Sequence, residues 1–263
     1  MLSNKLFLRS MILTPFALSV AACSGNFDFS VEPPQGDTGS TVLTVEDEGW
    51  FGGPDVRAPR MVGSVETVTL KPTRPLGNVV ALSSNSDVAD VKEMPSTASV
   101  CCSESAGAWQ CVGAGPRCDG VLEPVRRVEI VAKAPGQARV KLVDEAGHEV
   151  DGAALAVERG ASSDLAFRDG QATTGDAVTL SANTMHRYVV GFYSEKGVIL
   201  RAPGVVAVTT ADPSVIGFVG NGLLPGDTKA TGEAQGNLDA SKPGRTTITT
   251  SLGRVYTVDV VPR

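Results

Sequence analysis

The sequence predicts an all-β protein built as two tandem β-sandwiches after a signal peptide and a flexible stalk. Three observations predict it: short runs that alternate apolar and polar residues, frequent turns rich in Gly, Pro and Asp, and no run long enough for a core helix. Alternating runs include residues 67–70 and 139–142, and runs dense in Val, Tyr and Phe cover 187–193 and 254–261. About 200 residues of this kind suit two domains of typical sandwich size.

The first 22 residues have the pattern of a secretory signal peptide. Lys5 and Arg9 precede a short apolar stretch that ends in small residues, and this stretch is below the roughly 20 residues of a membrane-spanning helix. The residues that follow, Val20-Ala21-Ala22-Cys23, resemble the bacterial lipobox. The resemblance implies cleavage before Cys23 and acyl chains, palmitate among them, on this cysteine. It also implies a place in the bacterial cell envelope.

Ser24, rather than Asp, follows the lipobox cysteine. By analogy with enterobacterial sorting, we expect the outer membrane, on its periplasmic or surface face. Removal of the signal peptide leaves 21 basic and 29 acidic residues, a net charge of −8. An acidic chain without a basic cluster excludes nucleic acid as a partner, and membrane contact is expected through the N-terminal lipid alone.

Residues 23–63 are expected to form a flexible acidic stalk. Gly, Pro, Ser and acidic residues dominate this segment, which has too little apolar surface to offset the entropy of a folded chain. Only residues 41–45 look like a strand. Trp50 and Phe51 interrupt the segment, and they are expected to dock on the first domain or on a partner, so Trp50 is a candidate contact residue.

An internal repeat divides the remaining chain into domains at 64–160 and 161–263. The first copy has SSNSDVADV at 83–91 and APGQARVKLVDEAG at 134–147; the second has TTADPSVIGFV at 209–219 and KPGRTTITTSLG at 242–253. Each copy offers a polar turn, a valine-rich strand, a Pro-Gly turn and an alternating strand. These blocks resemble the group-2 type of bacterial immunoglobulin-like domains. The resemblance implies two immunoglobulin-like sandwiches, a type of module that often serves in adhesion or as a spacer.

The first copy carries an insertion, placed at 96–123, that holds every cysteine except Cys23. From Asp87 to Gly136 is 49 residues, whereas from Asp212 to Gly244 is 32, and the excess of 17 nearly equals the span from Cys101 to Cys118. Four cysteines in an exported protein predict two disulfides. Because a bond between neighbours would strain the chain, two pairings remain: 101–111 with 102–118, or 101–118 with 102–111. The spacing lacks the tight knuckles of a zinc site.

Two residues of the insertion are candidate contact residues, Trp109 and Arg117. Aromatic and arginine side chains dominate binding hot spots, and loops at the ends of sandwiches commonly bind partners. The alternative is that Trp109 covers the disulfides as part of a miniature core.

The sequence offers no catalytic residue, metal site or cofactor site. His148 and His186 are the only histidines, they lie in different repeats, and no hydrolase, P-loop or dinucleotide motif is present. Glu158, Asp164 and Asp169 near the domain junction suggest calcium, but they lack the spacing of a calcium loop.

These features favour a non-enzymatic envelope lipoprotein that acts as an adhesion, spacer or protein-interaction module. The alternative is an accessory lipoprotein that captures a carbohydrate or another substrate, with Trp109 or Trp50 stacking on a sugar. A third hypothesis is an enzyme with a site assembled from scattered residues. The expected partner is accordingly an envelope protein or a glycan.

Overall fold

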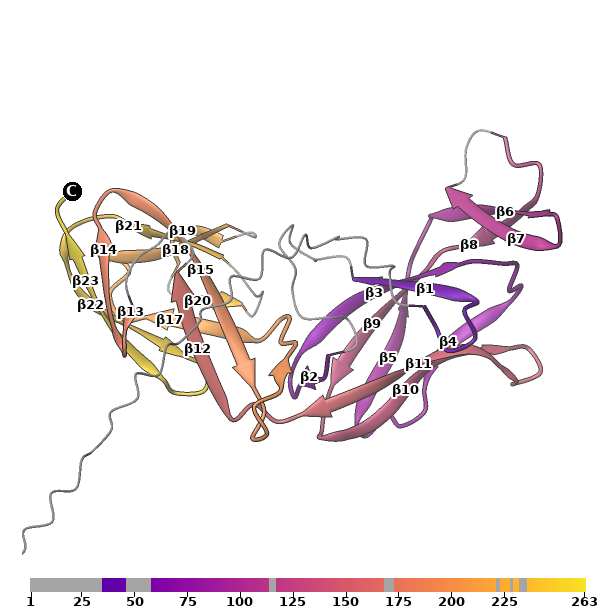
Figure 1. Ribbon diagram of the computed structural model, residues 1–263, viewed down its shortest axis with the longest axis horizontal. Coiled ribbons are helices and arrows are strands. Elements are labelled where there is room, and N and C mark those ends of the chain that lie inside the picture. Colours follow the sequence, from indigo (N-terminus) through magenta and orange to yellow (C-terminus); the bar gives the residue numbers. More distant parts are fainter. Residues whose placement is uncertain are drawn as a thin grey trace, which may run out of the picture. The chain divides into compact units, whose positions relative to one another are not determined.

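The computed structural model describes residues 35–45, 58–113, 117–167, 173–220, 223–227, 229–231 and 236–263, and every regular element among them is a β-strand. The all-β prediction is thus confirmed. The described residues belong to one compact unit, Pro33–Arg263, and Figure 1 shows its strands in chain order. No helix in this part of the chain is long and apolar enough to cross a membrane.

The first sandwich has two four-stranded sheets that enclose an aliphatic core. One sheet has the order β1 (Thr41–Val45), β3 (Val65–Pro72), β9 (Arg126–Ala132), β5 (Ala89–Met94). The other has the order β2 (Arg60–Met61), β11 (Glu149–Glu158), β10 (Gly136–Asp144), β4 (Val79–Ser83). Inward positions alternate along each strand, as a half-buried strand requires. The core includes Val68, Ile130, Val140 and Leu155.

The second sandwich has two larger sheets. One contains β12 (Ser162–Phe167), β15 (Thr184–Tyr193), β21 (Gly236–Ala240), β18 (Ile216–Gly220) and β19 (Leu223–Asp227), with β16 (Ile199–Leu200) paired to β15. The other contains β13 (Thr173–Thr174), β14 (Ala177–Ser181), β23 (Val255–Val261), β22 (Gly244–Thr250), β17 (Val206–Thr210) and β20 (Lys229–Thr231). Tyr188 and Phe218 meet edge to face in the core, with ring centroids 5.6 Å apart.

The insertion forms a third sheet instead of a loop. It has the order β7 (Ala108–Gly113), β6 (Ser99–Ser105), β8 (Val121–Pro124) and can be followed beside the first sandwich in Figure 1. We call β6, β7, β8 and their disulfides the stapled sheet. It connects β5 to β9, which are antiparallel neighbours in the first sandwich.

The stalk prediction is wrong for part of its range. Residues 41–45 form β1, which pairs with β3 along its whole length, and Arg60–Met61 forms β2, which pairs in parallel with the end of β11. Leu43 of β1 lies in the core. The first sandwich therefore begins well before residue 64, because its first strands come from a segment whose composition alone indicates no fold.

The two copies of the repeat form the same local turn, which explains why similar polar residues occur in both. In the first copy, the amides of Val88 and Ala89 donate to the carbonyl oxygen of Asn85; in the second, those of Val215 and Ile216 donate to that of Asp212. The side chains of Asn85 and Asp212 also accept a bond from the amide two residues on. Asp212 thus corresponds to Asn85 and not to Asp87, which corrects the repeat alignment and lengthens the excess in the first copy from 17 to 19 residues.

The glycine of each Pro-Gly turn lies against the valine that follows this polar turn. A Cβ atom on Gly136 would lie 2.7 Å from Cγ2 of Val88, and one on Gly244 would lie 3.0 Å from Cγ2 of Val215. Close packing against the valine thus favours glycine at both positions, and at Gly136 a φ of +154° favours it as well.

Gly136→Ala is expected to lower the free energy of unfolding by about 1–3 kcal/mol, because Val88 must move to admit the methyl group and because alanine disfavours the φ of +154° at this position. Gly244→Ala has 0.3 Å more room and should cost less. Denaturant titration of both variants and the parent protein tests this order. Equal stability of all three would contradict the close-packing explanation.

Candidate functional site

The stapled sheet holds both disulfides, in one of the two pairings left open by the sequence. Cys101 is bonded to Cys118 and Cys102 to Cys111. Cys102 and Cys111 are also direct partners across β6 and β7. Because successive residues of a strand point to opposite faces, Cys101 and Cys102 anchor their disulfides on opposite faces of β6. Both faces of the sheet are thus crosslinked.

A miniature core does lie under this sheet, but Trp109 is not one of its members. The cluster consists of Val100, Cys102 and Val125, with Cys111 packed against it. Trp109 is 40% exposed, and it pairs across the strands with Glu104. Part of the indole is thus available at the surface of a crosslinked sheet, and Arg117 is exposed as well.

The opposite face of the stapled sheet exposes two aliphatic residues that the sequence analysis missed. Val112 and Leu122 both stand directly across from Cys101, on β7 and β8, and their exposed fractions are 61% and 59%. Directly opposed residues share a face, so these side chains flank the Cys101–Cys118 disulfide. Val112 directly follows Cys111, but no comparable sequence signal marks Leu122.

The remaining candidate residues do not converge on this sheet or on one another. Cys23 and Trp50 lie outside the described residues. His148 is exposed in a turn next to Asp144, whereas His186 is buried in the second sandwich with Nε2 3.1 Å from the carbonyl oxygen of Ser181. The structure places the two histidines in separate sandwiches.

The acidic residues proposed for calcium are also dispersed. Asp164 forms an ion pair with Arg254, and Asp169 lies outside the described residues. Within the described ranges, no group of three His, Cys, Asp or Glu side chains is arranged to hold a metal ion.

A buried ion cluster, absent from the sequence analysis, joins the two sandwiches. We call Arg60, Glu66 and Arg201 the junction cluster; their exposed fractions are 5%, 3% and 7%. Nε and Nη2 of Arg60 donate to Oε2 of Glu66 at 2.8 and 2.7 Å. From the second sandwich, Arg201 donates to Oε1 of Glu66 through Nε at 2.8 Å and also through Nη2. One carboxylate is therefore shared by two guanidinium groups.

Burial and the neighbouring charges both act on the Arg60 guanidinium. Burial lowers the pKa of the Arg60 guanidinium below its ordinary value; the carboxylate of Glu66 opposes this, and the positive charge of Arg201 adds to the lowering. The group still carries its charge, because an arginine stays protonated in proteins. Glu66 is thus the residue that makes burial of both arginines tolerable.

Backbone hydrogen bonds and apolar contacts surround the junction cluster. The amide of Met61 donates to the carbonyl oxygen of Arg201, that of Arg201 to Pro59, and that of Val65 to Pro203. Met61, from β2 of the first sandwich, belongs to the hydrophobic core of the second. The short connection between the sandwiches is therefore reinforced by contacts distant in sequence.

No protein-family model and no curated protein matches the sequence. Among solved structures, the chain is similar to domains 5–6 of the S-layer protein SbsC, with 17% identity over 84% of this chain and 99% of that one and a TM-score of 0.28. It is also similar to the Escherichia coli adhesin FdeC (13% identity, 84% and 64% covered, TM-score 0.28). A third similar structure is that of the fibronectin(III)-like modules of Clostridium thermocellum CbhA (8% identity, 84% and 95% covered, TM-score 0.23).

The strand order and register define the class of this protein. It is an all-β protein with two immunoglobulin-like β-sandwiches in tandem, the first of which carries a disulfide-crosslinked sheet. The candidate functional features are the surface of this sheet and the buried junction.

Proposed function

We propose that this protein is a non-enzymatic lipoprotein of the bacterial cell envelope that acts as an adhesion, spacer or protein-interaction module. The observation that carries the proposal is the junction cluster. Domains in tandem generally move relative to one another unless a substantial interface fixes them. Here a shared carboxylate, three backbone hydrogen bonds and Met61 connect the two sandwiches. Such a connection suits a spacer that holds a binding surface at a fixed orientation.

The stapled sheet supports the interaction part of this proposal. Its disulfides reduce the freedom of the unfolded insertion, so that a small sheet with few core residues stays ordered. An ordered surface loses less entropy on binding, which favours affinity. Trp109, with Arg117 nearby in sequence, is the side chain on this sheet best suited to a partner.

Anchoring at Cys23 is the other part of the proposal. The lipobox-like residues and the signal-peptide pattern support it, since each buried CH₂ of an acyl chain adds about 0.8 kcal/mol of membrane affinity. Lipid attachment would keep a soluble pair of sandwiches at the envelope, where a spacer or an adhesion module acts.

A second candidate function is capture of a carbohydrate. The indole of Trp109 favours it, because an aromatic ring that is 40% exposed on a crosslinked sheet offers a flat apolar surface for stacking. Trp109→Ala should then abolish binding on a glycan array, whereas a protein partner would leave the array negative from the start.

Photocrosslinking in intact cells tests the proposed function. A photoreactive residue in place of Trp109 is expected to capture one recurrent partner, whereas the same residue in place of Met185, exposed on the second sandwich, should not. In a Cys23→Ala background the protein should leave the detergent phase, and capture should fall. The proposal would be rejected if Trp109 and Met185 positions gave the same adducts, or if Cys23→Ala left partitioning unchanged.

A further inference from the structure

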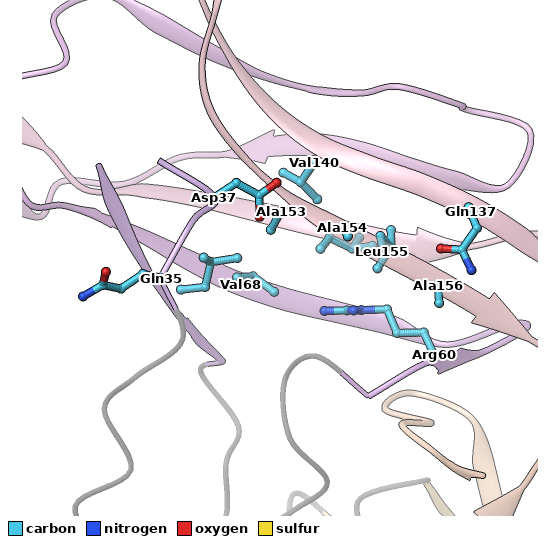
Figure 2. A pocket seen from close by; sticks show the side chains of 12 residues that line it. Gln35, Asp37, Arg60, Val68, Gln137, Val140, Ala153, Ala154, Leu155 and Ala156 are labelled. Atoms are coloured by element: carbon cyan, nitrogen blue, oxygen red, sulfur yellow. The ribbon is translucent and has the colours of Figure 1, made fainter. Parts of the chain in front are cut away.

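A pocket of about 240 Å³ lies in the first sandwich, and its lining extends from buried core residues to the exposed Gln35, Asp37 and Ala154. Its walls are apolar and come from both sheets: Leu43, Val68 and Ile130 on one side, Val140 and Leu155 on the other. Figure 2 shows Arg60 reaching into the pocket, with its guanidinium group pointing toward Val68. The pocket is therefore an apolar space with one buried cation on its wall.

Small residues of β11 border part of this space. Ala153, Ala154 and Ala156 all line it, and only Leu155 supplies a large side chain from the same stretch. The space is equivalent to about eight water molecules, and it is smaller than the roughly 300–1,000 Å³ that hold drug-sized molecules. A ligand must therefore be a small molecule or the end of a chain.

Arg60 lines the pocket and is not fully used by Glu66. Nε and Nη2 both donate to Glu66, while no bond from Nη1 is recorded within the described part of the chain. An anion at Nη1 would accept a charge-assisted hydrogen bond in a site where water screens little.

The polar residues at the pocket are compatible with an anion. Asp37 is the acidic residue among them, and Nη1 of Arg139 lies 2.6 Å from its carboxylate, which offsets its charge. Gln35 and Gln137 add neutral amides that are able to donate hydrogen bonds. The positive end of the pocket is thus at Arg60, beyond the apolar walls.

We propose that this pocket binds a small apolar carboxylate, whose hydrocarbon part fills the space between the sheets while its carboxylate accepts hydrogen bonds from Arg60. The ligand class follows from the combination of five aliphatic wall residues and one buried guanidinium group. Two kinds of ligand carry such a carboxylate: a free short-chain acid, and the C-terminus of a peptide that ends in an aliphatic residue. This binding site is separate from the stapled sheet, so the proposal does not depend on the proposed function.

Titration of the purified full-length protein with hexanoate and with hexanamide tests the site. Hexanoate is expected to raise the unfolding temperature and to shift NMR signals of the pocket methyl groups, because a ligand that binds only the folded state stabilises it. Hexanamide has the same shape without the charge and should bind about tenfold more weakly or worse. The two sources are distinguished with an N-acetylated peptide that ends in leucine, prepared as the C-terminal acid and as the C-terminal amide. If hexanoate binds and the peptide acid does not, the ligand is a free acid. If the peptide acid binds much more tightly than hexanoate, the ligand is a peptide C-terminus.

Ala153→Leu is the variant that separates the pocket from the junction cluster. Ala153 lies four residues before Val157, the β11 partner of Arg60, so the larger side chain is expected to fill the space away from the junction cluster, and hexanoate binding should fall about tenfold or more while the protein stays folded. Met185→Leu, on the second sandwich, is the matched control and should bind as the parent does. Equal binding of hexanoate and hexanamide, no binding of either, or unchanged binding by Ala153→Leu would overturn the proposal.

Discussion

Glu66→Gln is expected to lower the free energy of unfolding by about 3–5 kcal/mol, because it removes the carboxylate that two buried guanidinium groups share. Glutamine has nearly the same shape, so the loss reports charge and not packing. The same variant should loosen the junction: trypsin should cut faster after Arg159, an exposed residue between β11 and β12. Chemical denaturation and limited proteolysis measure the two effects.

The matched control is Asp90→Asn, which removes the carboxylate of an exposed ion pair with Lys133. Exposed pairs of this kind contribute about 0–1 kcal/mol, so this variant should unfold and be cleaved much as the parent is. If Glu66→Gln matched Asp90→Asn in both measurements, the junction cluster would not hold the sandwiches together.

Asp151→Ala is expected to lower the free energy of unfolding by about 2–4 kcal/mol. Asp151 is fully buried, and its carboxylate accepts bonds from the amides of Thr38 and Gly152 and from Oγ1 of Thr41, at 2.8–3.0 Å. Removing it leaves these donors without their acceptor and frees the segment that leads into β1. Hydrogen exchange of β1 amides should therefore accelerate more than that of β10 amides, and equal acceleration in both strands would contradict this role.

The same residue predicts how stability depends on pH. Burial raises the pKa of Asp151, but the hydrogen bonds from Thr38, Thr41 and Gly152 together hold that pKa below its ordinary value. Because the folded state has the lower pKa, this contribution is complete above the unfolded value of about 3.9 and is lost as pH falls through the folded value. Asp151→Ala should consequently lose less stability than the parent between about pH 5 and pH 2, whereas a parallel decline would contradict the assignment.

Much of the fold followed from local patterns. Residues 67–70, 139–142, 187–193 and 254–261 lie in strands β3, β10, β15 and β23. Turns at 144–147 and 194–197 close with the amides of Gly147 and Gly197 donating to Asp144 and Ser194. These features depend on residues a few positions apart, so alternation and turn chemistry are enough to predict them.

The features that were missed depend on residues far apart in sequence. Thr41 and Asp151 are 110 positions apart, and this pair helps to explain why a segment rich in Gly and Pro is folded. Gly36 shows the same constraint, since a Cβ atom there would lie 2.3 Å from Oδ2 of Asp151. Likewise, Glu66 and Arg201 are 135 positions apart, and nothing in either local stretch indicates that they meet.

The position of the stapled sheet has a consequence for how this protein can diversify. The insertion leaves the sandwich after β5 and returns at β9, where Met94 and Arg127 are direct partners in an antiparallel pair. The ends of the insertion are thus held close together by the sandwich itself, so its length adds little closure entropy. The hairpin of β18 and β21 in the second sandwich likewise pairs Val219 with Asn237 around its own connection. Evolution can therefore exchange one surface module for another between two such paired strands and leave the sandwich itself unchanged.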